Sequence, residues 1–153
     1  MCKTRNLGLA LSRGRYIAFL DQDDVWLPDA LAHLVHYLDH HESGAVCGQF
    51  QILVGGNQRL PLPVPFPPYA ASFVVPEKPL EIMKLGYDFL LCASLFRKSL
   101  VEQIGGFDEG FTAAGRYEDT EMSVRFSSVT NFGHISEVDA LYRIHERNIA
   151  TPG

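Results

Sequence analysis

The feature that most constrains the fold is a short apolar stretch that ends in a cluster of carboxylates. Residues 16–20 read YIAFL, and Asp21, Asp23 and Asp24 follow at once. Apolar side chains at successive positions, without alternation, are typical of a strand covered on both faces, as in a parallel sheet flanked by helices. We therefore expect a buried strand over Tyr16–Leu20, with the three aspartates at the edge where open α/β sheets bind ligands.

Three carboxylates this close together raise one another's pKa unless a cation lies among them. Hard oxygen ligands select Mg²⁺ or Mn²⁺. Because Mg²⁺ takes only about one or two protein carboxylates and fills its shell with water and substrate phosphates, a nucleoside diphosphate or a similar ligand is the expected partner. The spacing also leaves open an acidic turn ahead of a helix near Pro28, with Asp24 close to the positive end of the helix dipole.

Length and charge exclude several classes of protein. The 153 residues suit one domain with a single core. A hydrophobic fraction of 46%, a charged fraction of 20% and a mean hydropathy of +0.00 are typical of a globular chain, not of a disordered or membrane one. The net charge of −5 and the scattered basic residues exclude a nucleic-acid binder. Three cysteines without a C-x-x-C spacing indicate reduced thiols, and no signal peptide or membrane span is found.

The rest of the pattern predicts helices alternating with strands. The segment 61–69, which reads PLPVPFPPY, is expected to be an extended loop with polyproline character. Periodicity, capping residues and turn residues predict helices over 6–14, from 28 to about 43, over 79–85, from a capping box at 99–102 to Gly105, and over 119–127; they predict strands over 45–54, 89–96 and 135–144.

Four stretches carry a family resemblance. RNLGLALSRGRYIAFLDQDD (5–24) resembles an R-N-x-G segment that leads through a strand into D-x-D-D; GGFDE (105–109) resembles an acceptor-side turn; ED (118–119) resembles the start of a catalytic helix; and YRIHERNIAT (142–151) resembles a closing Y-R-x-H segment. In this order they resemble family 2 glycosyltransferases of the GT-A fold. The resemblance implies a Rossmann-like α/β domain, with a mixed, mainly parallel sheet flanked by helices, that occupies residues 1–153 as a single partial domain.

The resemblance also implies an activity and its residues. It implies an inverting transfer of a sugar from a nucleotide-diphosphate sugar to a hydroxyl of a glycan or lipid-linked acceptor, in the cytoplasm or at the membrane periphery. Mn²⁺ or Mg²⁺ is the implied cofactor. The implied roles are metal ligation by Asp21, Asp23 and His145, diphosphate binding by Arg5, Asp21, Asp24 and Arg143, and general base catalysis by Asp119.

The residues alone leave alternatives open for several of these roles. Asp119 suits a helix N-cap, His145 suits a hydrogen-bonded structural residue, and Arg5 suits a solvated helix start. A further cluster, formed by His33, His36, His40 and His41, is expected to lie on the solvated face of its helix, because no carboxylate or third ligand motif accompanies it.

The first β-α-β portion of these enzymes, with its P-x-Y-N strand and an aspartate that binds the nucleoside, has no counterpart in this sequence. Two expectations follow. Strand 16–20 should present an unpaired apolar edge that favours self-association. The isolated chain should also lack most of the nucleoside pocket, which keeps a second hypothesis open, a non-catalytic remnant that serves as a binding or self-associating module.

Overall fold

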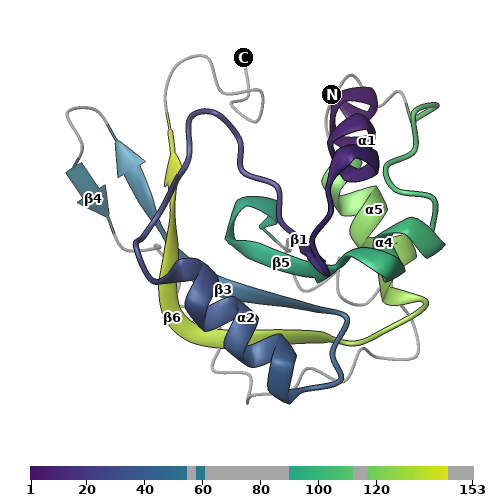
Figure 1. Ribbon diagram of the computed structural model, residues 1–153. Coiled ribbons are helices and arrows are strands. Elements are labelled where there is room, and N and C mark those ends of the chain that lie inside the picture. Colours follow the sequence, from purple (N-terminus) through teal and green to yellow (C-terminus); the bar gives the residue numbers. More distant parts are fainter. Residues whose placement is uncertain (55–57, 61–89, 112–116, 145–153) are drawn as a thin grey trace.

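A mixed six-stranded sheet organises the protein in the computed structural model, which describes residues 1–54, 58–60, 90–111 and 117–144 (Figure 1). The strand order is β1-β5-β3-β6-β2, and β4 pairs with β3 off this path. The strands are β1 (Tyr16–Ile17), β2 (Val25–Trp26), β3 (Ala45–Val54), β4 (Gln58–Leu60), β5 (Ser94–Arg97) and β6 (Phe132–Arg143).

The two long strands, β3 and β6, form the centre of the sheet and run parallel. Their register extends from Ala45 opposite Phe132 to Leu53 opposite Arg143, with irregularities between Cys47 and Phe50. The four other pairings are antiparallel and shorter. A mixed α/β sheet flanked by helices is therefore confirmed, and both long strands lie where the sequence pattern predicts them.

Strand β1 differs from the expectation of a buried parallel strand over 16–20, which is wrong in length and direction. It has two residues, lies at the end of the sheet and pairs antiparallel with β5. The apolar pattern has a different origin: Ile17 and Phe19 pack in one hydrophobic cluster, whereas Tyr16 and Ala18 pack in another. Alternate side chains thus reach opposite faces although the ladder ends after Ile17, and Leu20 is already 44% exposed.

Helix α2 (Ala30–His40) covers one face of the sheet and lies in front of β3 and β6 in Figure 1. The apolar spacing predicts that Leu31, Leu34, Val35 and Leu38 face the sheet. Leu34 and Leu38 are buried there together with Tyr37, and Val35 packs against them, but Leu31 is 45% exposed. The Tyr37 ring lies so close to β6 that a Cβ added at Gly133 would be 2.1 Å from its Cε1 atom. A glycine at that position is what lets the helix approach.

Three helices, α1 (Cys2–Leu11), α4 (Lys98–Gln103) and α5 (Glu118–Ser127), gather beside the other end of the sheet (Figure 1). Their shared core is largely aromatic and includes Leu9, Phe96, Phe107, Met122 and Phe126. The capping box expected at 99–102 is wrong: α4 begins directly after β5, so Arg97 is its N-cap and Ser99 lies inside the helix.

A third cluster surrounds the two buried cysteines, Cys47 and Cys92. Cys92 belongs to a 3₁₀ turn (Leu91–Ala93) that replaces the first half of the strand expected over 89–96. All three cysteines are free thiols, as expected. No helix in the described ranges has the length and apolar character needed to cross a membrane. The expected loop over 61–69 and the expected helix over 79–85 lie outside the described residues.

Candidate active site

One guanidinium brings the acidic loop (residues 21–24) and the start of α5 together. Arg5 projects from α1, and its Nη2 donates to Asp21 Oδ1 at 3.0 Å, while its Nη1 donates to Glu118 Oε1 at 2.7 Å. Arg5 and Glu118 lie 113 positions apart in the sequence. The two carboxyl-bearing segments that the resemblance assigns to donor and acceptor chemistry are therefore neighbours in the fold.

The three aspartates of the acidic loop have different environments. The Asp21 side chain is 54% exposed and pairs with Arg5, and Asp23 is half-buried. Asp24 is buried, and its Oδ1 accepts a hydrogen bond from the Arg143 backbone N–H at 2.9 Å. Burial raises the pKa of Asp24, against the opposing effects of that N–H and of the Cys92 thiol, which also hydrogen-bonds the carboxylate. Asp24 thus fixes the loop to the sheet.

Arg143 holds the same loop from the end of β6. Its Nε donates to the Asp23 backbone carbonyl at 2.8 Å, in addition to the backbone bond to Asp24. Just beyond the loop, the Trp26 indole N–H donates to the Cys92 carbonyl. The chain after β1 is therefore positioned by β6 and the 3₁₀ turn. Asp21, at the first position of the acidic loop, keeps an exposed carboxylate.

The first turn of α5 places Glu118 and Asp119 beside Arg5. Glu118 is buried, and Asp119 Oδ1 accepts a hydrogen bond from the Thr120 backbone N–H at 2.8 Å. The N-cap of α5 is Tyr117, which has a left-handed backbone with φ 66°, so the alternative of Asp119 as N-cap is wrong. Burial raises the pKa of Asp119, and the Glu118 carboxylate adds to this effect, while Arg5 opposes it. A raised pKa makes this carboxylate a better proton acceptor.

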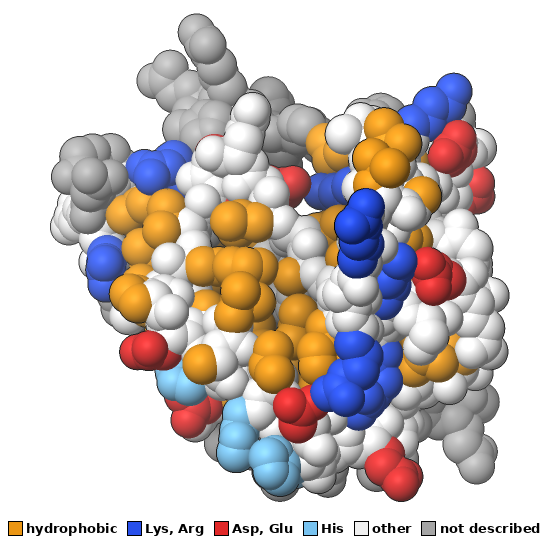
Figure 2. All heavy atoms as spheres, viewed as in Figure 1, with side chains coloured by type: hydrophobic (Ala, Val, Ile, Leu, Met, Phe, Trp, Pro, Cys, Tyr) orange, Lys and Arg blue, Asp and Glu red, His pale blue; other side chains and the backbone are white. Residues whose placement is uncertain are grey.

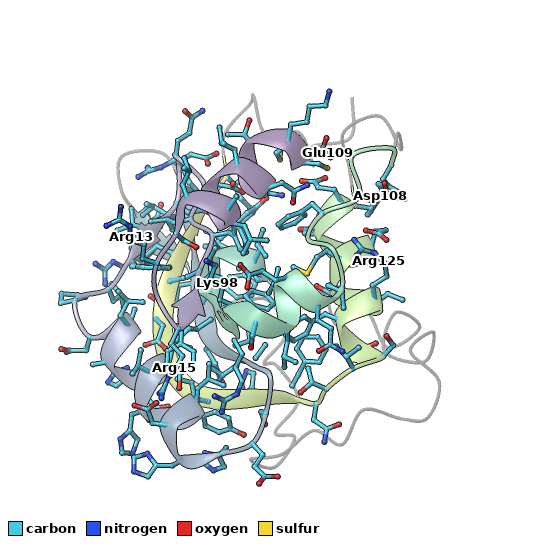
Figure 3. All side chains as sticks on the ribbon, turned by 45° about the vertical axis from the view of Figure 1, so that its right-hand side comes forward. Arg13, Arg15, Lys98, Asp108, Glu109 and Arg125 are labelled. Atoms are coloured by element: carbon cyan, nitrogen blue, oxygen red, sulfur yellow. The ribbon has the colours of Figure 1, made fainter. Side chains whose placement is uncertain are left out.

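The GGFDE turn is fixed against α1 by Asn6. The Asn6 side-chain amide accepts from the Phe107 backbone N–H and donates to the Phe107 carbonyl, both at 2.9 Å. It also donates to Glu109 Oε1 at 3.0 Å. On the other side, Arg125 of α5 donates to the Gly106 carbonyl at 2.8 Å, and Figure 3 shows Arg125 close to Asp108 and Glu109 next to α1. The turn is thus held between two helices.

The donor set of the acidic loop fits a hard divalent cation. Asp21 is exposed and Asp23 is half-buried, and two carboxylates are the number that Mg²⁺ usually takes from a protein before water and phosphate complete its shell. Asp24 is directed into the protein, and His145 lies outside the described residues. Within the described ranges, no group of three or more His, Cys, Asp or Glu side chains is arranged to hold a metal ion. Two protein ligands and a substrate phosphate are the arrangement these residues permit.

The histidine cluster of α2 is only partly the solvated face that the sequence predicts. The rings of His36 and His40 lie 4.3 Å apart, and His40 Nδ1 lies 2.8 Å from the His36 carbonyl oxygen. His33 differs, because its Nδ1 lies 2.8 Å from Oδ1 of Asp139, a residue with no exposed surface. The Asp139 hydrogen bond raises the pKa of His33, and burial raises the pKa of Asp139. This pair joins α2 to β6 and takes no part in the site around Arg5.

Sequence reasoning missed Glu118, Asn6 and Cys92 as parts of this arrangement. Two of them stand in recognised segments: Glu118 directly before Asp119, and Asn6 directly after Arg5. Their partners, however, are an arginine from α1 and the backbone of a distant turn. The family motifs include Glu118 and Asn6 and could have indicated them as site residues. Nothing in the sequence connects Cys92 with Asp24.

Comparison with solved structures shows the fold. The structure of S. aureus TarS residues 1–349 matches with a TM-score of 0.71 and 20% identity, over 93% of this chain and 40% of that one. The complex of the same protein with UDP-GlcNAc matches with a TM-score of 0.70 and 17% identity, over 97% of this chain and 40% of that one. The protein thus has the fold of one part of TarS.

Comparison with curated sequences identifies longer relatives. Uncharacterized protein y4gI of Sinorhizobium fredii is 26% identical over 155 residues, which is 100% of this chain and 15% of the relative. The E. coli UDP-Glc:alpha-D-GlcNAc-diphosphoundecaprenol beta-1,3-glucosyltransferase WfaP is 43% identical over 35 residues, 23% of this chain and 14% of the relative. The chain therefore spans only a small part of each.

The model of the family described as glycosyl transferase family 2 matches residues 1–105. Because that match covers more than half of the chain, the protein belongs to glycosyl transferase family 2.

Proposed function

We propose that this chain forms the catalytic part of an inverting glycosyltransferase, which transfers a sugar from a nucleotide-diphosphate sugar to a hydroxyl of a glycan or lipid-linked acceptor. The observation that carries the proposal is the bridge from Asp21 through Arg5 to Glu118. It puts the candidate metal-binding carboxylates and the candidate base, Asp119, on neighbouring segments. TarS has been solved with UDP and with UDP-GlcNAc, which supports a nucleotide sugar as donor here.

In this proposal the acidic loop serves the leaving group. Asp21 and Asp23 hold Mn²⁺ or Mg²⁺, with His145 as the proposed third ligand. When bound, the cation supplies a Lewis acid that neutralises the charge developing on the diphosphate. Asp24 keeps the loop in place through its bond to the Arg143 backbone. The Arg143 side chain, which donates to the Asp23 carbonyl of the same loop, is the proposed diphosphate contact.

Asp119 serves the acceptor in the same proposal. The acceptor hydroxyl must lose its proton as its oxygen attacks the anomeric carbon, and a positioned carboxylate contributes about 10²–10⁴ to the rate of such a step. The buried environment that raises the pKa of Asp119 suits it to take this proton. Its hydrogen bond from the Thr120 N–H fixes one of its oxygens.

Isothermal titration calorimetry of the chain with UDP and GDP, each with and without Mn²⁺, tests the donor side. The expected result is binding that requires Mn²⁺ and is abolished by Asp23→Ala, because the diphosphate is held through the cation. Asp119→Asn is the matched control, since the base contacts the acceptor and not the nucleotide. It should bind as the unchanged protein does, and a loss of binding in both variants would argue for general damage to the fold.

The second candidate function is a non-catalytic binding module. It is favoured by one observation: Asp21 and Asp24 already have protein partners, Asp21 with Arg5 and Asp24 with the Arg143 backbone. The absence of heat with every nucleotide, in the presence of Mn²⁺, would support this candidate and contradict the proposed enzyme.

A further inference from the structure

The guanidinium of Arg5 is one group shared by two carboxylates. One arm lies 2.7 Å from Glu118 Oε1, and the other lies 3.0 Å and 3.4 Å from the two oxygens of Asp21. The side chains of Arg5 and Glu118 are each only 10% exposed, whereas that of Asp21 is 54% exposed. One contact of the guanidinium is therefore shielded from water and the other is open to solvent.

A third contact restricts the movement of this group. The guanidinium carbon lies 5.3 Å from the centroid of the Phe107 ring, which is buried in the core of α1, α4 and α5. The backbone of Phe107 is itself held by two hydrogen bonds with Asn6, the residue next to Arg5: its N–H donates to Asn6 and its carbonyl accepts from Asn6. Arg5 can thus shift between its two carboxylates, but it cannot turn away from both without leaving Glu118 buried and unpaired.

We propose that Arg5 is a positioning residue that couples the acidic loop to the start of α5, so that loss of its contact with Asp21 alters the position of the backbone carrying Asp119. Charge-assisted hydrogen bonds from one guanidinium compete for the same donor charge. When Asp21 no longer accepts from Arg5, the hydrogen bond from Arg5 to Glu118 tightens and the first turn of α5 moves with it.

The inference rests on the proposed function for its role, because it makes the alignment of the base respond to occupation of the donor side. The coupling itself, however, belongs to the protein without any ligand. It can therefore be measured whether or not nucleotide and Mn²⁺ bind, and a failed calorimetric titration would contradict the proposed function without touching this inference.

The test is an Asp21→Asn substitution made in two backgrounds, the unchanged chain and Arg5→Met, and observed by two-dimensional ¹H–¹⁵N NMR. In the unchanged chain the substitution should shift the amide signals of Glu118 and Asp119. It should also slow hydrogen exchange at the Glu121 amide, whose N–H donates to the Tyr117 carbonyl at 2.9 Å and closes the first turn of α5. In the Arg5→Met background both effects should disappear, which is the non-additivity that a shared partner produces.

Controls separate this coupling from general effects of charge and stability. Asp29→Asn removes one negative charge between the acidic loop and α2 and should leave the Glu118 and Asp119 signals in place. Arg5→Lys keeps the positive charge without the planar fork and should transmit a smaller shift. Since Arg5→Met leaves Glu118 buried without its cation, Arg5→Met with Glu118→Gln is a second background in which no charge is left unpaired.

Three outcomes would overturn the inference. The first is unchanged Glu118 and Asp119 signals when Asp21→Asn is made in the unchanged chain. The second is a shift of the same size in both backgrounds that lack Arg5, which would place the coupling elsewhere. The third is a shift of the Glu118 and Asp119 signals in Arg5→Lys as large as in the unchanged chain. It would show that the positive charge alone carries the coupling and that the two-armed geometry of the guanidinium does not.

Discussion

The two adjacent glycines of the GGFDE turn permit a sharp test of how α1 holds that turn. Gly105 and Gly106 have φ angles of +83° and +69°, which side chains disfavour. A Cβ at Gly105 would meet nothing within 4 Å, whereas one at Gly106 would lie 2.6 Å from Oδ1 of Asn6. Gly105→Ala therefore tests the backbone conformation alone, and Gly106→Ala tests the conformation together with the Asn6 contact.

The magnitudes follow from these two terms. The left-handed conformation costs about 1–2 kcal/mol for a residue with a Cβ, so Gly105→Ala should lower the free energy of unfolding by about that amount. In Gly106→Ala the Asn6 oxygen must also move and leave the buried Phe107 N–H without its acceptor, which costs about 1–3 kcal/mol more. In a chain of this size each kcal/mol corresponds to about 2–4 °C in melting temperature.

Urea unfolding followed by circular dichroism measures both costs, and Asn6→Ala supplies the background that isolates the contact. Without the Asn6 side chain, the two alanine substitutions should cost the same within error, although the protein as a whole is less stable. Equal costs in the unchanged chain, or an excess cost at Gly106 that persists in the Asn6→Ala background, would refute the reasoning.

Three further predictions concern other parts of the fold. Both His33 and Asp139 have raised pKa values, so the folded state holds more protons than the unfolded state; stability should fall as pH rises from 6.5 through the raised pKa of His33, and His33→Gln should flatten the melting temperature measured over that range. Burial raises the pKa of both buried cysteines, that of Cys47 to about 11, so a thiol reagent should label only Cys2 rapidly in the folded chain and all three cysteines after denaturation. Hydrophobic side chains gather around β1 and α2 in Figure 2, and β1 ends the sheet, so sedimentation should show concentration-dependent association that Leu20→Lys weakens; a monodisperse monomer at every concentration would contradict this.

The sequence predicts the helices and strands correctly where a regular apolar pattern packs against a single part of the core. Helices α2 and α5 and strands β3 and β6 were predicted from periodicity and turn residues, because each packs one consistent face, or both faces, against the core. Strand β1 was predicted incorrectly because its side chains reach two clusters while its backbone leaves the ladder after two residues. The burial pattern of a strand and the length of its hydrogen-bonded ladder are separate properties. Only the burial pattern can be predicted from the order of apolar residues in the sequence.

The candidate site divides in a similar way. The order of the motifs predicted that the acidic loop and the start of α5 act together, and the structure brings Asp21 and Glu118 to one arginine. The roles proposed for individual residues remain predictions. The sequence could not predict that the three aspartates have different environments. Asp24 is bonded to a backbone N–H of β6 and to a thiol of the 3₁₀ turn, and both partners are distant in the sequence.

The position of β6 in the sheet has a consequence for how the chain folds. The strand nearest the C-terminus among the described elements lies between β3 and β2, so neither neighbour can complete its hydrogen bonds until residues 132–143 have been synthesised. Until then the apolar edge of β3 is unpaired and can pair with another chain. This stage lasts while the ribosome adds the residues up to the end of β6, at about 5–20 residues per second. Such non-local pairing also slows folding in general. Recombinant production of this chain should therefore benefit from chaperones and low temperature, since the stage most exposed to aggregation comes before β6 is inserted.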